Sequence, residues 1–343
     1  MEKMKVGVYY NNKDVRVECR DIPKIGDREI LVKVRACGIC GSDVMEWYRI
    51  KKAPRVLGHE MTGDIVKVGK EVKDFKVGDR VFVSHHVPCN SCRYCLRGDH
   101  TLCDTLHSTN FDPGGFSEYV RIPEINVRTG TFLLPDEISY DEGVFIEPLA
   151  CVIRGFRIAE IKPNQTIAVI GSGIAGLLQI KLAKAWGAKK IIAVDINEYR
   201  LKKAKEFGAD IILNASDEGL PRRIMEENDG YLADTVILSA GVKSAFIQAL
   251  KCVDRGGTLL LFAPLPPEID IPVNVFDVWN RQIKIVSTYA GAPRDIKEAI
   301  EVLKSRKIRV NDMITHRLSL DEIQKGFKLV AEAQRSLKVV IHP

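Results

Sequence analysis

TIAVIGSGIAGLLQIKLAKAWGAKKIIAVD, residues Thr166 to Asp195, is the stretch that decides the fold. It begins with the short β-branched run Ile167–Ile170, which predicts a buried strand, and it breaks at a glycine-rich turn, residues 171–176. After the turn, apolar residues recur at helical spacing until Gly187, and a second apolar strand ends at Asp195. The stretch therefore predicts a strand, a helix and a second strand, the unit from which parallel sheets are built.

The glycines of this turn suit a dinucleotide. Gly171 permits the tight turn, Gly173 lets the backbone approach a pyrophosphate, and Gly176 lets the helix pack closely against the strand. Asp195, 19 residues after Gly176, is placed to accept hydrogen bonds from both adenosine ribose hydroxyls, and a 2′-phosphate would meet a like charge there. We therefore predict that NAD rather than NADP binds, at Gly171, Gly173, Ile174, Ala175, Gly176, Asp195 and Arg200.

Strands and helices continue to alternate after Asp195, which predicts an α/β fold with a doubly wound parallel sheet of the Rossmann type. A helix is expected from about Glu198 to Gly208, with strands at Ile211–Leu213, Thr235–Leu238, Gly257–Phe262 and Ile283–Val286. Residues 1 to about 80 instead show strand patterns separated by glycine turns, which predicts a mostly β domain. Near the C-terminus we expect helices at about Asp295–Lys304 and Asp321–Ala333 and a strand at Leu337–Ile341.

Length and composition fit about two domains, because 343 residues with 45% apolar residues can form two cores. The net charge of +6 is mild, and the basic clusters lie among acids, so solvated helix faces are favoured over nucleic-acid binding. The first residues lack the apolar region of a signal peptide, and no stretch reaches the length of a membrane span. We expect a cytoplasmic protein that does not bind membranes.

Four cysteines, Cys89, Cys92, Cys95 and Cys103, lie close together in a loop rich in proline, asparagine, serine and glycine. In a reducing compartment a disulfide framework is not expected, and four unpaired thiols in a polar loop would be open to oxidation. Four thiolates at this spacing can instead complete a tetrahedral shell around one zinc, with no position left for substrate. The spacing predicts a structural zinc site.

A second group has the ligand types of a catalytic zinc, which keeps one position open. Cys40 follows Cys37-Gly38-Ile39, and His59 and Glu60 follow Gly58. Taken alone, a cysteine is more often a packing residue and a histidine a satisfied core residue. Glu147 lies in the apolar segment 144–152, where a carboxylate must be paired, neutral or bound to metal, and metal is preferred because this site needs a third ligand. Cys151 and Cys252 lack partners at ligand spacing and are assigned to the core.

The motifs together resemble those of the zinc-dependent medium-chain alcohol dehydrogenase superfamily over essentially the whole chain. They occur in the family's order: GICGSD, GHE, the four-cysteine loop, GGFSEYV, IEPLACV and GSGIAG. The segment Ile146–Leu149 looks most like sorbitol (L-iditol) and related polyol dehydrogenases, where ethanol-type members carry a cysteine ligand.

This resemblance implies a GroES-like catalytic domain, 1–150 and 287–343, around an inserted Rossmann NAD-binding domain, 151–286, with the active site between them. It implies Cys40 and His59 as ligands of a catalytic zinc, with Glu60 and Glu147 beside the metal and either able to bind it. Asp43 matches the acid that orients the histidine ligand. Ser42 matches the hydroxyl that takes the substrate proton while the zinc polarises the alcohol and hydride passes to NAD+. Family members are commonly homodimers or homotetramers.

The resemblance has two departures. Many members carry a histidine that finishes the proton relay where this chain has Met45, so the proton leaves by another route, such as water. Polyol dehydrogenases place a substrate-binding arginine where this chain has Thr288, which weakens the case for sorbitol itself. His85, His86 and His107 either line the pocket or lie exposed in loops.

The preferred interpretation is an NAD- and zinc-dependent dehydrogenase of a secondary alcohol, a polyol or sugar alcohol. L-threonine 3-dehydrogenase shares this plan. A zinc-free quinone or enone reductase is disfavoured, because its members lack the ligands kept here as Cys40, His59 and Glu147. The alternative from another class is a non-catalytic dinucleotide-binding protein.

Overall fold

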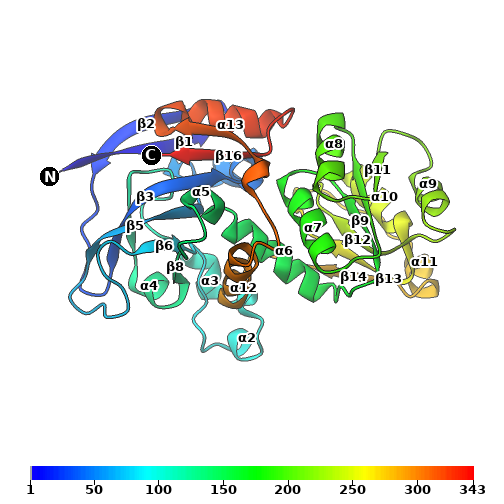
Figure 1. The fold of residues 1–343 in the computed structure, drawn as a ribbon, viewed down its shortest axis with the longest axis horizontal. Coiled ribbons are helices and arrows are strands. Elements are labelled where there is room, and N and C mark those ends of the chain that lie inside the picture. The colour runs from blue at the N-terminus through cyan, green and yellow to red at the C-terminus, as the bar shows by residue number, and fades with distance from the viewer. Residues whose placement is uncertain (1) are drawn as a thin grey trace. The chain divides into compact units, whose positions relative to one another are not determined.

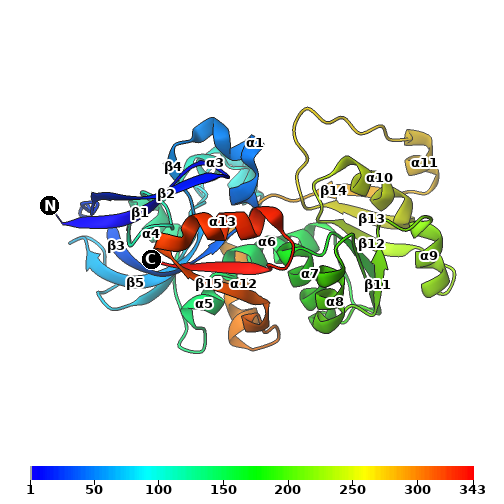
Figure 2. The same cartoon turned by 90° about the horizontal axis from the view of Figure 1, so that it is seen from above.

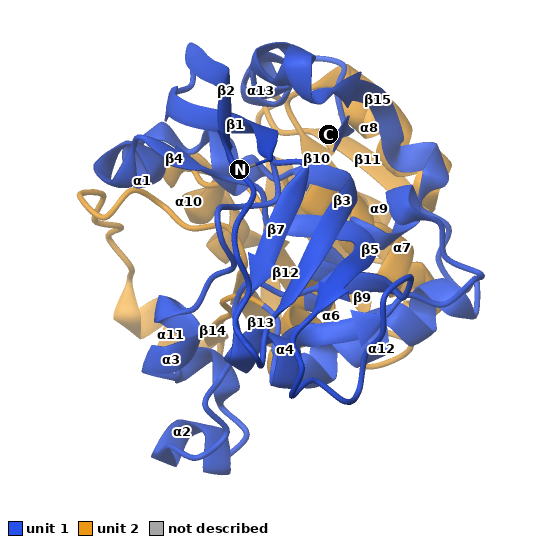
Figure 3. Cartoon of the chain, turned by 90° about the vertical axis from the view of Figure 1, so that its left-hand side faces the viewer, with its two compact units in different colours: residues 1–150, 291–343 blue, residues 151–290 orange. Residues whose placement is uncertain are grey.

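The computed structural model describes residues 2–343 and divides them into two compact units (Figure 3). Unit 1 contains the residues up to 150 together with 291–343, and unit 2 contains residues 151–290. The boundary at residue 150 falls within helix α6 (Ile146–Ile158). Unit 2 therefore ends four residues after the boundary predicted at 286, and the roles predicted for the two parts stay predictions.

Unit 1 is built mainly from strands. A three-stranded sheet has the order β2-β1-β4, and a seven-stranded sheet has the order β15-β16-β3-β5-β6-β8, with β7 also paired to β3. The strands are β1 (Lys3–Asn11), β2 (Asp14–Asp21), β3 (Ile30–Ile39), β4 (Arg55–Val56), β5 (Glu60–Val68), β6 (Arg80–Val83), β7 (Tyr119–Ile122), β8 (Thr131–Leu133), β15 (Ile314–Ser319) and β16 (Lys338–His342). The helices are α1 (Glu46–Arg49), α2 (Arg93–Leu96), α3 (Asp104–Ser108), α4 (Glu124–Gly130), α5 (Tyr140–Gly143), α12 (Pro293–Lys304) and α13 (Ile323–Glu332), with short 3-10 turns that include η1 (Gly41–Val44) and η2 (Ile50–Lys52).

The end of the chain returns to its beginning within unit 1 (Figures 1 and 2). Strand β16 pairs antiparallel with β3, and β3 pairs with β5, so that Gly38 lies opposite Glu60. The core beneath these strands includes Val6, Val34, Ile39 and Phe327, which are all buried. This pairing brings Lys338, the first residue of β16, close to the C-terminal end of β3, which Cys40 directly follows.

Unit 2 contains a six-stranded sheet of order β11-β10-β9-β12-β13-β14, in which every pair is parallel. Its strands are β9 (Thr166–Ile170), β10 (Lys190–Asp195), β11 (Ile211–Asn214), β12 (Ala233–Leu238), β13 (Val253–Leu261) and β14 (Lys284–Ser287). Helices α7 (Ile174–Ala185) and α8 (Glu198–Phe207) pack together, and so do α9 (Leu220–Glu227) and α10 (Lys243–Cys252); α11 (Val275–Asn280) precedes β14 (Figure 2). This strand order confirms the predicted Rossmann-type fold.

The turn after β9 needs its glycines for steric reasons. Gly171 has a φ of +99°, and a Cβ there would lie 2.8 Å from the backbone carbon of Ser239. A Cβ at Gly176 would lie 2.0 Å from the carbonyl oxygen of Gly171. Real Cβ atoms do not approach this closely, so the turn between strand and helix forms only with glycine at both positions.

The predicted strands and helices of unit 2 are confirmed, whereas α9, α10 and α11 were not predicted. Of the cysteines assigned to the core, Cys252 is fully buried and Cys151 is partly exposed. Among residues 2–343, no helix combines the length and the apolar character that a membrane crossing requires.

Candidate functional site

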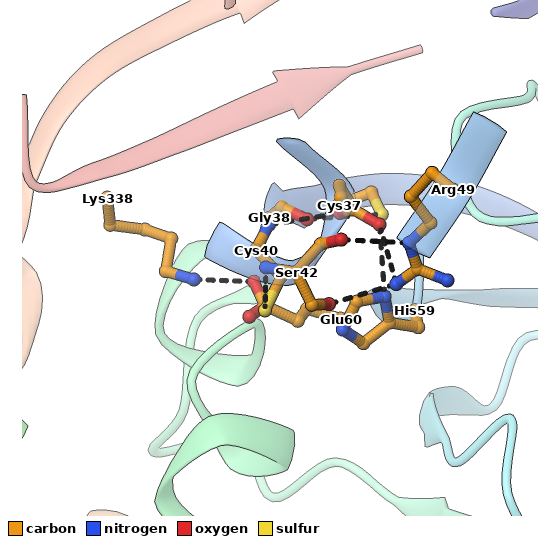
Figure 4. A network of polar contacts seen from close by, with 9 residues as sticks. Cys37, Gly38, Cys40, Ser42, Arg49, His59, Glu60 and Lys338 are labelled. Atoms are coloured by element: carbon orange, nitrogen blue, oxygen red, sulfur yellow. Dashed lines mark hydrogen bonds and ion pairs between the residues drawn. The ribbon is translucent and has the colours of Figure 1, made fainter. Parts of the chain in front are cut away.

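Three predicted metal ligands meet in unit 1. One ligand atom each from Cys40, His59 and Glu60 lies within 4.8 Å of the other two (Figure 4). Cys40 is the N-cap residue of η1, directly after β3, and Glu60 is the first residue of β5, directly after His59. Because β3 and β5 are neighbours in one sheet, their ends bring the two motifs together although 18 residues separate Cys40 from His59.

One carboxylate oxygen of Glu60 forms an ion pair with Lys338, and the other has no hydrogen-bond partner among the described residues. The side chains of Glu60 and Lys338 are both fully buried, and Lys338 Nζ lies 2.5 Å from Glu60 Oε2 (Figure 4). Glu60 Oε1 is buried and has no hydrogen-bond partner among the described residues. A buried carboxylate oxygen without a partner is costly, so this atom fits a metal ion held with Cys40 and His59. Sequence reasoning missed Lys338 because 277 residues lie between it and Glu60.

Asp43 orients the histidine of this group. It is completely buried, and its Oδ1 lies 3.4 Å from His59 Nδ1, while its Oδ2 accepts a hydrogen bond of 3.0 Å from the backbone N–H of Cys40. Burial lowers the pKa of His59, but Asp43 and Cys40 together raise it well above its ordinary value. With Nδ1 facing Asp43, Nε2 is the nitrogen left for a metal.

Arg49 holds Ser42 in place. Arg49 Nε donates to the carbonyl oxygen of Ser42 at 2.8 Å, and its NH2 group donates to Ser42 Oγ at 2.9 Å (Figure 4). The same guanidinium lies 3.4 Å from Asp43 Oδ1 and stacks over the ring of Tyr48. A guanidinium has no acceptor, so the hydroxyl hydrogen of Ser42 must point to another group. No sequence pattern predicts this contact, because an arginine seven residues after a serine is commonplace.

The remaining candidates of unit 1 are Glu147 and three histidines. Glu147, in the first turn of α6, is outside the group of three, but its charge acts on Lys338. The ring of His85 lies 4.9 Å from that of His59 and 3.8 Å from that of His86, and both histidines are partly buried, whereas His107 is exposed. His85 and His86 are therefore not in exposed positions, and His107 is exposed but lies in α3 rather than in a loop.

The four cysteines of the predicted structural site converge as well. The ligand sulfurs of Cys89, Cys92, Cys95 and Cys103 all lie within 4.8 Å of one another, with three of the separations at 3.6 to 4.0 Å. Four sulfurs about 2.3 Å from a tetrahedral zinc would be about 3.8 Å apart. Apart from the cysteines, the cluster contains one buried apolar residue, Leu106, so the loop has little core of its own.

The predicted cofactor residues form a turn around a buried carboxylate in unit 2. Asp195, at the end of β10, accepts hydrogen bonds from the backbone N–H groups of Ser172 at 2.7 Å and Asn197 at 2.9 Å. Arg200 NH1 lies 4.0 Å from Asp195 Oδ2 and is the nearest group that a Cβ at Gly173 would meet, also at 4.0 Å. No other atom crowds the backbone at Gly173, and the next residues, Ile174 and Ala175, are the first two of α7.

Two family models match the chain. A model of the alcohol dehydrogenase GroES-like domain matches residues 26–131, and a model of zinc-binding dehydrogenases matches residues 175–305. The chain is 34% identical to sorbitol dehydrogenase of Bacillus subtilis (strain 168), over all of this chain and 98% of that protein.

Solved structures show the same likeness along the full length. Galactitol-1-phosphate dehydrogenase from Escherichia coli is 29% identical with a TM-score of 0.88, over 99% of this chain and 100% of that one. A zinc-binding dehydrogenase from Sinorhizobium meliloti 1021, solved with bound NADP, is 28% identical with a TM-score of 0.89, over the whole of both chains.

Proposed function

The chain belongs to the zinc-dependent medium-chain alcohol dehydrogenase family, and from this membership we propose that it oxidises a secondary alcohol of a polyol to the ketone. The observation that carries the proposal is the convergence of Cys40, His59 and Glu60, whose Oε1 is buried without a hydrogen-bond partner among the described residues. We propose that these three residues hold a catalytic zinc, with Glu147 as the alternative carboxylate, and that Cys89, Cys92, Cys95 and Cys103 hold a structural one.

We assign each residue of the group a role in the oxidation of the alcohol. Cys40, His59 and Glu60 would hold the zinc, which would supply a Lewis acid to polarise the alcohol oxygen. Asp43 keeps His59 in the tautomer whose Nε2 can bind metal. Ser42 would accept the proton of the alcohol on the lone pair that Arg49 leaves open, and would release its own hydrogen to a water molecule. We assign the acceptor of the hydride to NAD+, bound at the turn of unit 2.

The preference for NAD+ is proposed from Asp195. Its buried carboxylate would accept hydrogen bonds from ribose hydroxyls and repel a 2′-phosphate. We expect Asp195→Ala to raise KM for NAD+ about tenfold and to lower KM for NADP+, because the like charge is gone. Initial rates with both cofactors measure this. Equal use of NAD+ and NADP+ by the wild type would contradict the proposal.

The proposed substrate class is tested by measuring initial rates of NAD+ reduction with polyols, inositols, simple secondary alcohols and L-threonine. Turnover of polyols without L-threonine is expected. Oxidation of L-threonine alone would select the threonine dehydrogenase alternative, and NADH binding without turnover of any alcohol would select a non-catalytic dinucleotide-binding protein. We further propose a homodimer or homotetramer in the cytoplasm; light scattering during gel filtration measures the oligomer.

A further inference from the structure

Arg49 holds a single residue, Ser42, at two points. Its Nε donates to the carbonyl oxygen of Ser42 at 2.8 Å, and its NH2 group donates to Ser42 Oγ at 2.9 Å (Figure 4). The first bond fixes the backbone of Ser42 and the second fixes the direction of its hydroxyl. The backbone N–H of Ser42 in turn donates to Cys40 Sγ at 3.4 Å. The hydroxyl that Arg49 holds is therefore carried by a residue in direct contact with a proposed metal ligand.

The guanidinium is itself held by its surroundings. The side chain of Arg49 is 18% exposed, its NH2 group lies 3.4 Å from Asp43 Oδ1, and its central carbon lies 4.9 Å from the centre of the Tyr48 ring. Arg49 ends α1, and its backbone N–H donates to the carbonyl oxygen of Met45 at 3.0 Å. A fixed cation thus follows Met45 by one helical turn. Met45 is the position at which the resemblance leads us to expect a relay histidine.

Arg49 determines how the hydroxyl of Ser42 can be used. A hydroxyl has one hydrogen and two lone pairs, and a guanidinium can only donate. Arg49 therefore occupies one lone pair and leaves the hydrogen and the other lone pair available. Within residues 2–343, Ser42 Oγ is the donor of no hydrogen bond, and Ser42 is partly exposed. Water from solvent is therefore the acceptor that remains for the hydrogen.

The charge of Arg49 acts in the same direction. An alcohol that loses its proton becomes negative, whereas a serine that gains a proton before releasing its own becomes positive. A neighbouring guanidinium attracts the first charge and repels the second. Arg49 therefore favours a transfer in which Ser42 gives up its hydrogen as it receives the proton of the alcohol.

We infer that Arg49 is the positioning residue of the proton transfer, which presents the open lone pair of Ser42 to the alcohol and directs the proton to solvent water. The O–H bond of the alcohol breaks as a new O–H bond forms on Ser42, and the original O–H bond of Ser42 breaks as a water molecule takes that proton. The products are an alkoxide and a hydronium ion, and the alkoxide then gives hydride to NAD+ and becomes the ketone. The inference rests on the proposed function and supplies a proton route that needs no histidine at Met45.

The test separates the contact with Ser42 from the contact with Asp43. Arg49→Met removes every donor, Arg49→Lys keeps the charge without the two-point geometry, and Arg49→Ala leaves space for a guanidinium ion from solution. Arg128→Met and Arg128→Ala are the controls, because Arg128 is 72% exposed on α4 of the same unit.

Each zinc-loaded variant is assayed with sorbitol, xylitol and 2,3-butanediol. The measured quantities are kcat, KM for the alcohol and for NAD+, the solvent deuterium isotope effect and the zinc content, and thermal unfolding checks the fold. The assays of both alanine variants are repeated with guanidinium chloride at concentrations below those that unfold the protein.

We expect Arg49→Met to lower kcat about a hundredfold and to raise the solvent isotope effect, with zinc content and KM for NAD+ unchanged. Arg49→Lys should keep more activity than Arg49→Met. Guanidinium should raise kcat of Arg49→Ala at least tenfold and should not raise that of Arg128→Ala. The two Arg128 variants should match the wild type.

An unchanged kcat in Arg49→Met would overturn the inference. A lower kcat that accompanies loss of zinc or of stability, and that guanidinium does not restore, would also overturn it and would assign Arg49 to the support of Asp43. An effect confined to KM for NAD+ would assign Arg49 to cofactor binding instead. Absence of turnover in the wild type with every alcohol would contradict the proposed function itself, and the inference would fall with it.

Discussion

Lys338 and Glu60 form an ion pair that water does not reach, and each side chain is fully buried. Burial lowers the pKa of Lys338, but the charge of Glu60 raises it above its ordinary value, so the ammonium group stays charged. The pair therefore holds Oε2 of Glu60 on the lysine and leaves Oε1 buried without a hydrogen-bond partner among the described residues. Lys338 is a positioning residue for Glu60.

Lys338→Met should destabilise the zinc-free protein by about 3 to 5 kcal/mol, because it leaves a buried carboxylate without its counter-charge. Adding zinc should reduce this loss, since a bound metal supplies positive charge to the same carboxylate. Urea unfolding with and without zinc measures both values. The double variant Lys338→Met with Glu60→Gln is the control and should be more stable than Lys338→Met alone. Equal stability of Lys338→Met and the wild type without zinc would refute this role.

At the residue scale, sequence motifs predicted the residues that act through their type and local spacing. Cys40, His59 and Glu60 were predicted, because the motif that contains Cys40 and the motif that contains His59 and Glu60 are each recognisable from neighbouring residues. Only the meeting of these two motifs in space depends on the fold. Lys338 and Arg49 were not predicted. Lys338 reaches Glu60 only through the pairing of β16 with β3, and Arg49 reaches Ser42 only because a short helix turns the chain back.

The four-cysteine loop is an element that depends on its metal. Its cluster offers Leu106 as the one apolar core residue besides the cysteines, and helices α2 and α3 are too short to be stable alone. We expect Cys95→Ser to remove one zinc per chain and to open residues 89–103 to proteases, while the sheets of unit 1 remain folded.

Zinc analysis and limited proteolysis followed by mass spectrometry measure these effects. Cys19→Ser is the matched control, because Cys19 is exposed on β2, outside both cysteine groups. Unchanged zinc content and unchanged cleavage in Cys95→Ser would rule out a metal-dependent loop.

Helix α5 joins two parts of unit 1 that are far apart in the sequence. Glu142 accepts hydrogen bonds from Arg306 and from Asn311, and Asp141 from His342. Burial raises the pKa of Glu142, but the hydrogen bonds from Ser139 and Arg306 lower it below the ordinary 4.5. Because the pKa of Glu142 is lower in the folded protein than in the unfolded chain, its ionised carboxylate stabilises the folded state. This contribution is fully present above pH 4.5, the ordinary pKa, and is lost as the pH falls through the lower pKa of the folded protein.

Glu142→Gln should therefore lower stability by about 2 kcal/mol at pH 7, and the difference from the wild type should shrink below pH 4. Urea-unfolding midpoints at several pH values measure this. Glu332→Gln, which removes an exposed ion pair with Lys328, should have little effect at any pH. A Glu142→Gln difference that does not change with pH would contradict the assigned cause.

For the molecule as a whole, periodicity predicted the parallel sheet of unit 2, since each of its strands is a short apolar run followed by a turn. Helices α9 to α11 escaped prediction because their apolar stripes are short and mixed with charges, as in Leu220–Glu227. The return of residues 291–343 to unit 1 could not be derived from any local pattern. It was expected only through resemblance, because strand pairing between distant segments leaves no periodic signal.

The central claim is that Cys40, His59 and Glu60 hold a catalytic zinc separate from the four-cysteine zinc. The most direct test measures zinc content and NAD+ reduction on the same preparations of the wild type and Cys40→Ser, using the best substrate of the polyol series. We predict two zinc ions per chain in the wild type, one in Cys40→Ser, and a loss of about a thousandfold in kcat/KM, equivalent to about 4 kcal/mol. Two zinc ions and undiminished turnover in Cys40→Ser would contradict the account.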